Sequence, residues 1–247
     1  MSFTNKTVVI TGGSSGIGAA TAVLFAKEEA NVVIIGRNET NLNKVAKDCE
    51  EYGRRPLIIK ADLFKDEDVK SVITKTIQKY NRIDVLVNSA AHYHDGTILD
   101  GNLLKAYDEV MNFNVLRVIV QLTNLVIPYL TETKGNIINL SSIPMLSNIP
   151  YFVSKVALDH FTRCAALELA PVGVRVNAVN PGYVRTATLL EEVGDNADML
   201  EEYKKLAALK KLAEPEEIAG IVMFLASDKA ACITGANYVV DNGTLLK

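Results

Sequence analysis

Seven short apolar runs alternate with longer stretches of helical periodicity along almost the whole chain. The runs are nearly continuous in Val and Ile, a pattern typical of strands that are covered on both faces. They are Thr7–Thr11, Asn31–Ile35, Pro56–Lys60, Ile83–Val87, Gly135–Leu140, Arg175–Ala178 and Tyr238–Val240. Because parallel strands are joined by right-handed crossovers, the alternation predicts an α/β fold of the Rossmann type. We expect a doubly wound parallel sheet of about seven strands with helices on both faces.

The stretches between these runs are expected to be helices, and prolines mark several of their boundaries. They are Gly16–Glu29, Asn41–Tyr52, Glu67–Tyr80, Leu103–Asn112, Val115–Leu130, Tyr151–Leu169 and Pro215–Ala226. We find no linker, internal repeat or low-complexity segment, so residues 1–247 are expected to form one domain. Residues 186–211 carry no strand pattern and are rich in Glu and Lys, with a possible helix pair over Asp198–Lys211. Such segments often act as substrate lids, and a plain connector is the alternative.

Composition narrows the classes of function. A chain of 247 residues that is 49% hydrophobic can bury one large core. Its net charge of −3, without a basic block, argues against nucleic acid as a partner. No apolar run reaches the ~18 residues of a membrane span, and the N-terminus lacks the apolar core of a signal peptide. The cysteines, Cys49, Cys164 and Cys232, lack metal-ligand spacing, so we expect a reduced cytoplasmic protein without a metal site.

A glycine-rich string follows the first predicted strand and opens the first predicted helix. Glycine allows a tight turn and close approach of the backbone to a pyrophosphate, and the helix N-terminus favours its charge. A glycine turn without a ligand is the alternative. The residues expected to contact a dinucleotide here are Gly12, Ser14, Ser15, Gly16, Ile17 and Gly18.

The end of the second predicted strand bears on the choice between NAD and NADP. Sites for NAD place an acidic residue there, whereas NADP sites carry a basic one. Arg37 offers a guanidinium suited to a phosphate. Glu39 could read the ribose of NAD, but a carboxylate is ordinary at a helix start. NADP(H) is therefore favoured over NAD(H).

Tyr151 and Lys155 lie four positions apart on a predicted helix, shortly after Ser142. A phenol with a pKa of ~10 is a poor acid–base catalyst at neutral pH unless its anion is stabilised. We expect the Lys155 ammonium to lower the pKa of Tyr151 and Ser142 to polarise a substrate carbonyl. With the dinucleotide site, these groups indicate a nicotinamide-dependent oxidoreductase.

Taken together, these motifs resemble the short-chain dehydrogenase/reductase family over essentially the whole chain, in particular its NADP-preferring carbonyl reductases and 3-oxoacyl reductases. The motifs that carry the resemblance are TGGSSGIG at 11–18, Asp62, Asn88-Ser89-Ala90-Ala91, Asn114, Ser141-Ser142, Tyr151 with Lys155, Asn180-Pro181-Gly182, Thr186 and Val240-Asp241-Asn242-Gly243.

The resemblance also implies roles for individual residues. Asp62 would cap the adenine, Asn88 would hold a strand edge near the adenosine ribose, and Asn114 would position a water for proton relay. Val184 and Thr186 would hold the nicotinamide amide. Further contacts with the cofactor are implied for Leu63, Ala90, Pro181 and Gly182, besides Tyr151 and Lys155. A homotetramer or homodimer is implied as well, with long helices paired across a two-fold axis.

The chain departs from the family pattern at two places. Ala91 stands where the family has glycine, and its methyl group could force a backbone change if the position needs positive φ. Ser142 and Tyr151 are only nine positions apart, which is shorter than the family spacing and should open one wall of the pocket. The apolar Met145, Leu146 and Ile149 in this connection are a weak sign of a lipophilic substrate.

His92 and His94 follow the fourth predicted strand. As metal ligands they lack further partners in the sequence. A solvated loop is expected, and lining of the substrate pocket is the alternative.

The sequence thus predicts an NADP(H)-dependent oxidoreductase that interconverts a ketone or aldehyde and an alcohol. Its partner would be a small-molecule substrate. An NAD-linked alcohol dehydrogenase and a catalytically silent dinucleotide-binding protein remain as alternatives.

Overall fold

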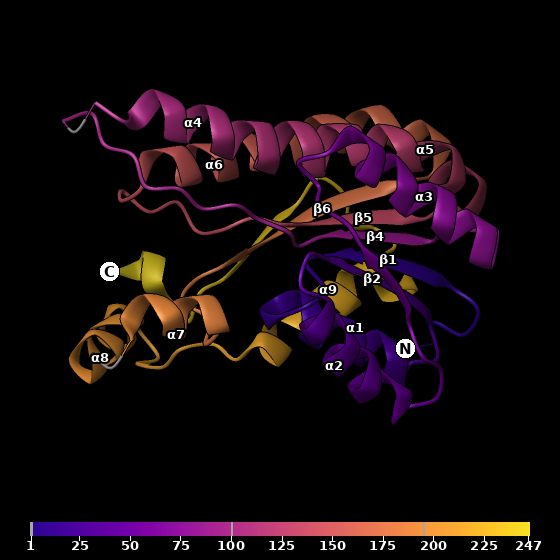
Figure 1. The fold of residues 1–247 in the computed structure, drawn as a ribbon, viewed down its shortest axis with the longest axis horizontal. Coiled ribbons are helices and arrows are strands. Elements are labelled where there is room, and N and C mark those ends of the chain that lie inside the picture. Colours follow the sequence, from indigo (N-terminus) through magenta and orange to yellow (C-terminus); the bar gives the residue numbers. More distant parts are fainter. Residues whose placement is uncertain (1, 100, 195) are drawn as a thin grey trace.

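A wholly parallel sheet of seven strands forms the centre of the computed structural model, which describes residues 2–99, 101–194 and 196–247 (Figure 1). The strands are β1 Thr7–Thr11, β2 Asn31–Gly36, β3 Leu57–Lys60, β4 Val85–Asn88, β5 Asn136–Leu140, β6 Arg175–Pro181 and β7 Asn237–Val240. Their order in the sheet is β3-β2-β1-β4-β5-β6-β7. The predicted doubly wound α/β fold is confirmed. The first residue of each strand lies within two positions of the predicted first residue.

Helices cover both faces of the sheet (Figure 1). One face carries α1 Gly16–Lys27, α2 Glu39–Glu50 and α9 Pro215–Ala226, and the other carries α3 Asp66–Tyr80, α4 Leu103–Met111, α5 Leu122–Thr133 and α6 Ile149–Leu169. Each face has its own apolar cluster. In β1, Val8 and Ile10 belong to one cluster and Val9 to the other, as the two-residue period of a strand requires. Burial on both faces explains why the strand sequences are nearly continuous in apolar residues.

The chain between α4 and α5 remains helical, which corrects the prediction of two separate helices, Leu103–Asn112 and Val115–Leu130. A π-helical segment, η1, spans Asn112–Gln121 and joins them into one helix, Leu103–Thr133. The predicted break fell between Asn112 and Val115. In the structure Asn114, within that gap, is buried and hydrogen-bonded, and the helix continues through it.

By length and composition, Leu103–Thr133 is also long and apolar enough to cross a membrane, although 44% of its most apolar window is buried in the protein. The sequence was expected to contain no apolar run long enough to span a membrane. The helix passes a different test, because hydropathy averaged over 18 residues tolerates scattered polar residues that interrupt a run. Core helices pass the same test. Val118, Leu122 and Val126 of this helix pack in the apolar cluster of their sheet face, so the helix is weak support for a membrane span.

The predicted helix pair near the C-terminal end lies earlier than Asp198–Lys211. It consists of α7 Ala187–Val193 and α8 Ala197–Leu206, which lie apart from the helix layers (Figure 1). The side chain of Asn196 accepts a hydrogen bond from Met199 N and so starts α8 earlier than charge pattern alone indicated. Asp195, inside the predicted lid, lies outside the described residues. Short 3-10 turns occupy Ala170–Val172, Asp228–Ala230 and Thr244–Leu246.

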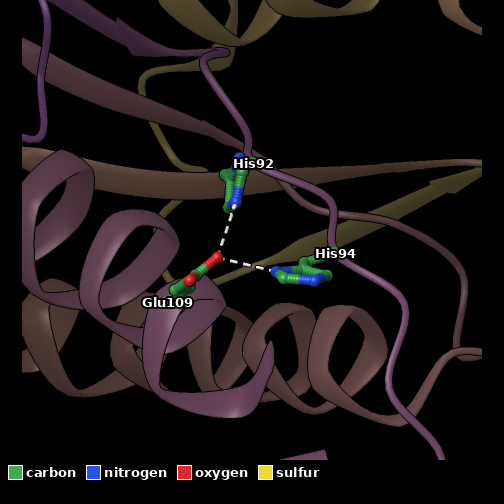
Figure 2. A group of neighbouring side chains, drawn as sticks. All are labelled: His92, His94 and Glu109. Carbon is green, nitrogen blue, oxygen red and sulfur yellow. Dashed lines mark hydrogen bonds and ion pairs between the residues drawn. The ribbon is translucent and has the colours of Figure 1, made fainter. Parts of the chain in front are cut away.

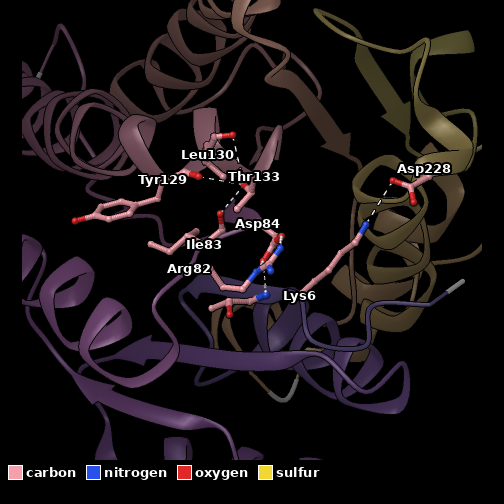
Figure 3. A network of polar contacts seen from close by, with 9 residues as sticks. Lys6, Arg82, Ile83, Asp84, Tyr129, Leu130, Thr133 and Asp228 are labelled. Carbon is pink, nitrogen blue, oxygen red and sulfur yellow. Dashed lines mark hydrogen bonds and ion pairs between the residues drawn. The ribbon is translucent and has the colours of Figure 1, made fainter.

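A polar network joins elements at the amino ends of the strands (Figure 3). The buried Asp84 carboxylate accepts hydrogen bonds from Arg82 Nε and Nη2, at 2.8 and 2.6 Å, and from Thr7 N at 2.8 Å. Thr133 Oγ1 donates to Ile83 O at 2.8 Å and so ties the end of α5 to the same corner. Asp84 therefore satisfies a strand-end N–H that would otherwise be buried without a partner.

We predict that Asp84→Ala destabilises the fold by about 1–3 kcal/mol, because it leaves the Thr7 N–H buried and unsatisfied. The free energy of unfolding in urea measures this. Asp228→Ala is the matched control, since Asp228 pairs with Lys6 in the same network but its side chain is 94% exposed. Equal effects of the two substitutions would contradict the assigned importance of Asp84.

Candidate active site

A cleft of about 570 Å³ lies at the carboxyl ends of the strands. The sequence-predicted residues that line it are Gly12, Ser14, Ser15, Gly16, Ile17, Arg37, Leu63, Ala90, Ser142, Tyr151, Pro181, Gly182, Val184 and Thr186. The remaining predicted site residues, Gly18, Asp62, Asn88, Asn114 and Lys155, are not among its lining residues. The structure thus brings most of the predicted site into one cleft and places the rest around it.

The glycine loop leaves room for backbone only. Gly12 has φ +68°, and a Cβ there would lie 2.9 Å from Ala90 N. A Cβ on Gly18 would lie 2.3 Å from Gly12 O, so helix α1 packs directly on the loop. The side chain of Ser15, the N-cap of α1, makes no capping hydrogen bond, and the first N–H groups of the helix are left for a ligand. This loop therefore fits a dinucleotide pyrophosphate.

Arg37 and Glu39 differ in their surroundings at the end of β2. Arg37 is exposed and lines the cleft. Glu39 begins α2, is not a lining residue, and forms an ion pair with Lys60 at 3.0 Å. Glu39, the acidic candidate for binding the ribose hydroxyls of NAD, is therefore already paired with Lys60.

Asp62 is engaged in its own turn. Its Oδ1 accepts a hydrogen bond from Phe64 N at 3.2 Å, and its backbone N donates to Asp68 Oδ2 at 2.7 Å. The neighbouring Leu63 is buried and lines the cleft. Contact of Asp62 with an adenine stays a prediction.

Asn88 connects β4 to β5 rather than facing the cleft. Its Nδ2 donates to Asn139 Oδ1 at 2.9 Å, and Asn139 Nδ2 donates to Thr162 Oγ1 of α6 at the same distance. This chain of amides fixes the strand ends under the cleft, and through Thr162 it also fixes α6.

Tyr151 and Lys155 lie one turn apart on α6. The start of this helix is held by Asn148, whose Oδ1 accepts from Tyr151 N at 2.9 Å. The buried Lys155 Nζ donates to Leu140 O at 2.8 Å and lies 5.4 Å from the centre of the Tyr151 ring. The phenol and the ammonium thus occupy the same corner, as the spacing predicted.

The expected lowering of the Tyr151 pKa is absent from this structure. Burial raises the pKa of Tyr151 to about 12, and neighbouring Tyr93 adds to the rise. Burial also lowers the pKa of Lys155 to about 8, although Asp159 opposes this. The physical reason is that desolvation penalises both charged forms more than their partners stabilise them, and Lys155 directs its ammonium to a backbone carbonyl.

Of the two adjacent serines, Ser142 has the freer hydroxyl. Ser141 Oγ donates to Lys155 O at 3.1 Å, whereas Ser142 Oγ has no hydrogen-bond partner among the described residues. The backbone of Ser142 is fixed because its O accepts from Asn180 Nδ2 at 2.9 Å, and that amide also donates to Asp159 Oδ2. Ser142 is thus the serine able to donate to a ligand in the cleft.

The side chain of Asn114 is bound to protein on three sides. Its Oδ1 accepts from His92 N at 2.7 Å, and its Nδ2 donates to His92 O and to Ser154 Oγ, both at 3.0 Å. Ser154 Oγ in turn donates to Tyr151 O at 2.6 Å. Asn114 therefore positions the segment after β4 against α6, and water relay stays a prediction.

The segment after β4 tolerates the departure at Ala91, which is not among the described residues with positive φ. His92 and His94 do not line the cleft; both turn towards Glu109 of α4 (Figure 2). The segment is a partly exposed loop, as expected, but its two histidines face a carboxylate that the sequence did not reveal. Glu109 was missed because it lies on a different element, far along the chain.

Three tyrosines of the cleft were also missed. Tyr93 is 51% exposed and lies 5.5 Å from Tyr151, ring centre to ring centre. Tyr183 stacks on Tyr203 of α8, with ring centres 4.4 Å apart, which brings α8 to the cleft. Two of them could have been found from the sequence. Tyr93 lies between two histidines, and Tyr183 directly follows Pro181-Gly182.

Comparisons with known proteins agree with this geometry. A family model described as enoyl-(acyl carrier protein) reductase matches residues 12–244. The chain is 34% identical to the 3-oxoacyl-[acyl-carrier-protein] reductase FabG of Thermotoga maritima, over 100% of both chains. It superposes with a TM-score of 0.92 on L-sorbose reductase of Gluconobacter frateurii, solved with NADPH and L-sorbose, at 32% identity over 100% of this chain and 99% of that one. A short-chain dehydrogenase/reductase of Caenorhabditis elegans, solved with cofactor, gives 0.90 at 34% identity over 99% and 96%.

The pKa of Lys155 predicts how stability depends on pH. Its folded value of about 8 lies below the ordinary 10.5, so the unfolded chain binds more protons between these values. Stability should therefore rise with pH in this window, by up to about 1.4 kcal/mol per pH unit, and be lost as pH falls towards 8. The raised pKa of Tyr151 acts in the opposite direction above pH 10.

The measurement is the difference in unfolding free energy between wild type and Lys155→Met, followed from pH 8 to 10. Lys105→Met, at an exposed position of α4, is the control and should parallel wild type. A Lys155→Met profile that also runs parallel to wild type would refute the buried ammonium.

Proposed function

The chain belongs to the short-chain dehydrogenase/reductase family, and we propose that it is an NADP(H)-dependent reductase of lipophilic ketones or aldehydes. It is an oxidoreductase that interconverts a carbonyl group and an alcohol with a nicotinamide cofactor. One observation carries the proposal. Tyr151 and Ser142 line the same cleft as the glycine loop before α1, and the buried Lys155 Nζ lies 5.4 Å from the centre of the Tyr151 ring.

In the proposed reaction, the cofactor supplies the hydride when bound. Ser142 Oγ donates a hydrogen bond to the substrate carbonyl oxygen and polarises the carbonyl. The Tyr151 hydroxyl gives that oxygen its proton. Lys155 supports Tyr151 from the next turn of α6, and Asn114 keeps this part of α6 in place through Ser154.

The protonation state of Tyr151 fits the role of proton donor in the reductive half of the proposed reaction. With its pKa raised to about 12, the phenol keeps its proton at neutral pH. Reduction needs that proton on the phenol, whereas oxidation of an alcohol needs the phenolate. Because burial is the main cause of the raised pKa, positive charge brought near Tyr151 would be needed for the reverse reaction.

The lining of the cleft supports a lipophilic substrate. It includes Tyr93, Met145, Phe152 and Leu189, which offer apolar surface. The shortened connection between Ser142 and Tyr151 contributes Met145 directly. The relatives include a sugar reductase and an acyl-carrier-protein-linked reductase by name, so the fold itself does not select a substrate.

Arg37 supports NADP(H) as the cofactor, because it faces the cleft while Glu39 is paired with Lys60. The predicted lid, residues 186–211, is supported by Leu189 and Tyr203, which line the cleft from α7 and α8. We propose that this segment closes over the substrate.

We further propose a homotetramer in the cytoplasm. Apolar side chains are exposed along the long helices, with Leu116 at 50%, Val156 at 53% and Leu167 at 80% exposure. Such surface is suited to a two-fold contact between copies. The free thiols of the three cysteines fit a reducing compartment.

We predict that Tyr151→Phe lowers kcat for NADPH-dependent reduction of a carbonyl panel by about 10²–10⁴-fold, because the proton donor is lost. Binding of NADPH, followed by its fluorescence, should persist. Tyr107→Phe, on α4 and away from the cleft, is the matched control. Cofactor binding without turnover in wild type would favour the silent-binder alternative instead.

We predict that Arg37→Ala weakens NADPH binding by about 10- to 100-fold and NADH binding little, because only NADPH carries the phosphate that Arg37 would bind. Titration calorimetry with each cofactor measures the ratio. Glu39→Gln should leave the ratio unchanged. If Arg37→Ala spares NADPH and Glu39→Gln weakens NADH, the NAD-linked dehydrogenase is the better assignment.

A further inference from the structure

Three side chains with metal-binding atoms converge beside the cleft (Figure 2). His94 Nδ1 lies 2.6 Å from Glu109 Oε2, and His92 Nε2 lies 3.8 Å from the same oxygen. One ligand atom from each of the three residues can be chosen so that all three lie within 4.8 Å of one another. Figure 2 shows both imidazoles turned towards the carboxylate from the segment after β4, with Glu109 reaching up from α4.

His92 supplies an observation independent of this clustering. Its Nε2 is buried and has no hydrogen-bond partner among the described residues. The ring is packed against Phe64 and Phe113, with ring centres 5.2 and 5.9 Å away, which limits its rotation although 27% of the side chain is exposed. Buried polar nitrogens almost always have a partner, and this one points to the Glu109 carboxylate from beyond hydrogen-bond distance.

We propose that His92, His94 and Glu109 bind a divalent zinc-like cation. Two imidazole nitrogens and one carboxylate oxygen form a donor set that zinc uses with a fourth position open to water. A tetrahedral zinc ion with bonds of about 2.0–2.1 Å holds its ligand atoms about 3.3 Å apart. The distances of 2.6 and 3.8 Å lie on either side of that separation.

The site can adjust to the cation on its open side. The side chains of His94 and Glu109 are 37% and 39% exposed, so they can shift by about an ångström and admit water as a further ligand. The His92 side is rigid because of its aromatic neighbours. Binding would replace the His94–Glu109 hydrogen bond by two bonds to the metal and give the His92 nitrogen its missing partner.

The backbone that carries the two histidines is already fixed. Asn114 holds both N and O of His92, and Asn148 Nδ2 donates to His94 O at 3.2 Å. Such supporting contacts orient metal ligands before binding. Tyr93 stands between the histidines and packs on Tyr151, so the cation would also anchor one wall of the cleft to α4. The site itself does not depend on the proposed reductase activity.

Zinc titration of the full chain, after dialysis against a chelator, tests the proposal. Calorimetry should give about one zinc ion per chain. His94→Gln and Glu109→Gln should each weaken binding by at least about 100-fold, since loss of a supporting contact alone costs 10–100-fold. The matched control is His160→Gln, because His160 is the third histidine of the sequence and lies exposed on α6 near Cys164.

Two further readouts protect the test against misfolded variants. Zinc should raise the midpoint of thermal unfolding of wild type and His160→Gln but not of His94→Gln. Cobalt(II) bound to wild type should show the intense visible absorption of four- or five-coordinate cobalt. The proposal is overturned if wild type does not bind saturably, if cobalt keeps its weak aqueous spectrum, or if His160→Gln removes binding while His94→Gln retains it.

Discussion

The seam between β1 and β4 determines where this protein can bind a ligand. Thr11 Oγ1 accepts hydrogen bonds from Ser89 N and Ala90 N, and Gly12 lies so close to Ala90 that no side chain would fit between them. The strand order reverses direction here, with β2 and β3 on one side and β4 to β7 on the other. In doubly wound sheets the loops diverge at such a point and leave a crevice. The glycine loop forms one side of that crevice, and the segment after β4 forms the other.

The reactive end of the cleft is held by side-chain amides. Asn114 joins the π-helical segment to His92 and, through Ser154, to α6. Asn148 caps α6 at Tyr151 and reaches back to the carbonyl of His94. Directional hydrogen bonds fix distance and angle together, which apolar packing alone does not. The backbone segments that carry Tyr151, Tyr93 and the two histidines are therefore tied to one another by these hydrogen bonds.

The sequence was sufficient to predict the sheet and most of the residues that line the cleft. Buried strands and glycine turns depend on residues that are close together in the sequence, so they can be recognised locally. It failed where an outcome depended on partners distant in the chain. The π-helical segment has wider turns than an α-helix and departs from its period of 3.6 residues, so a single helix resembled two. Glu109 and Tyr203 carry no local signal for the contacts they make. The direction of the Tyr151 pKa shift follows from burial, which a spacing of four residues does not encode.

Helix α8 has no buried residue in the structure, and it meets the cleft through the stack of Tyr203 on Tyr183. An element that buries so little can detach without exposing the sheet core. We therefore expect its opening free energy to be a small fraction of that for global unfolding and its amide protons to exchange fast. In the proposed lid role, α8 would control access to the cleft through a local equilibrium that is separate from the overall stability of the fold. Evolution could tighten or loosen that equilibrium by changing α8 alone, without altering the sheet beneath it.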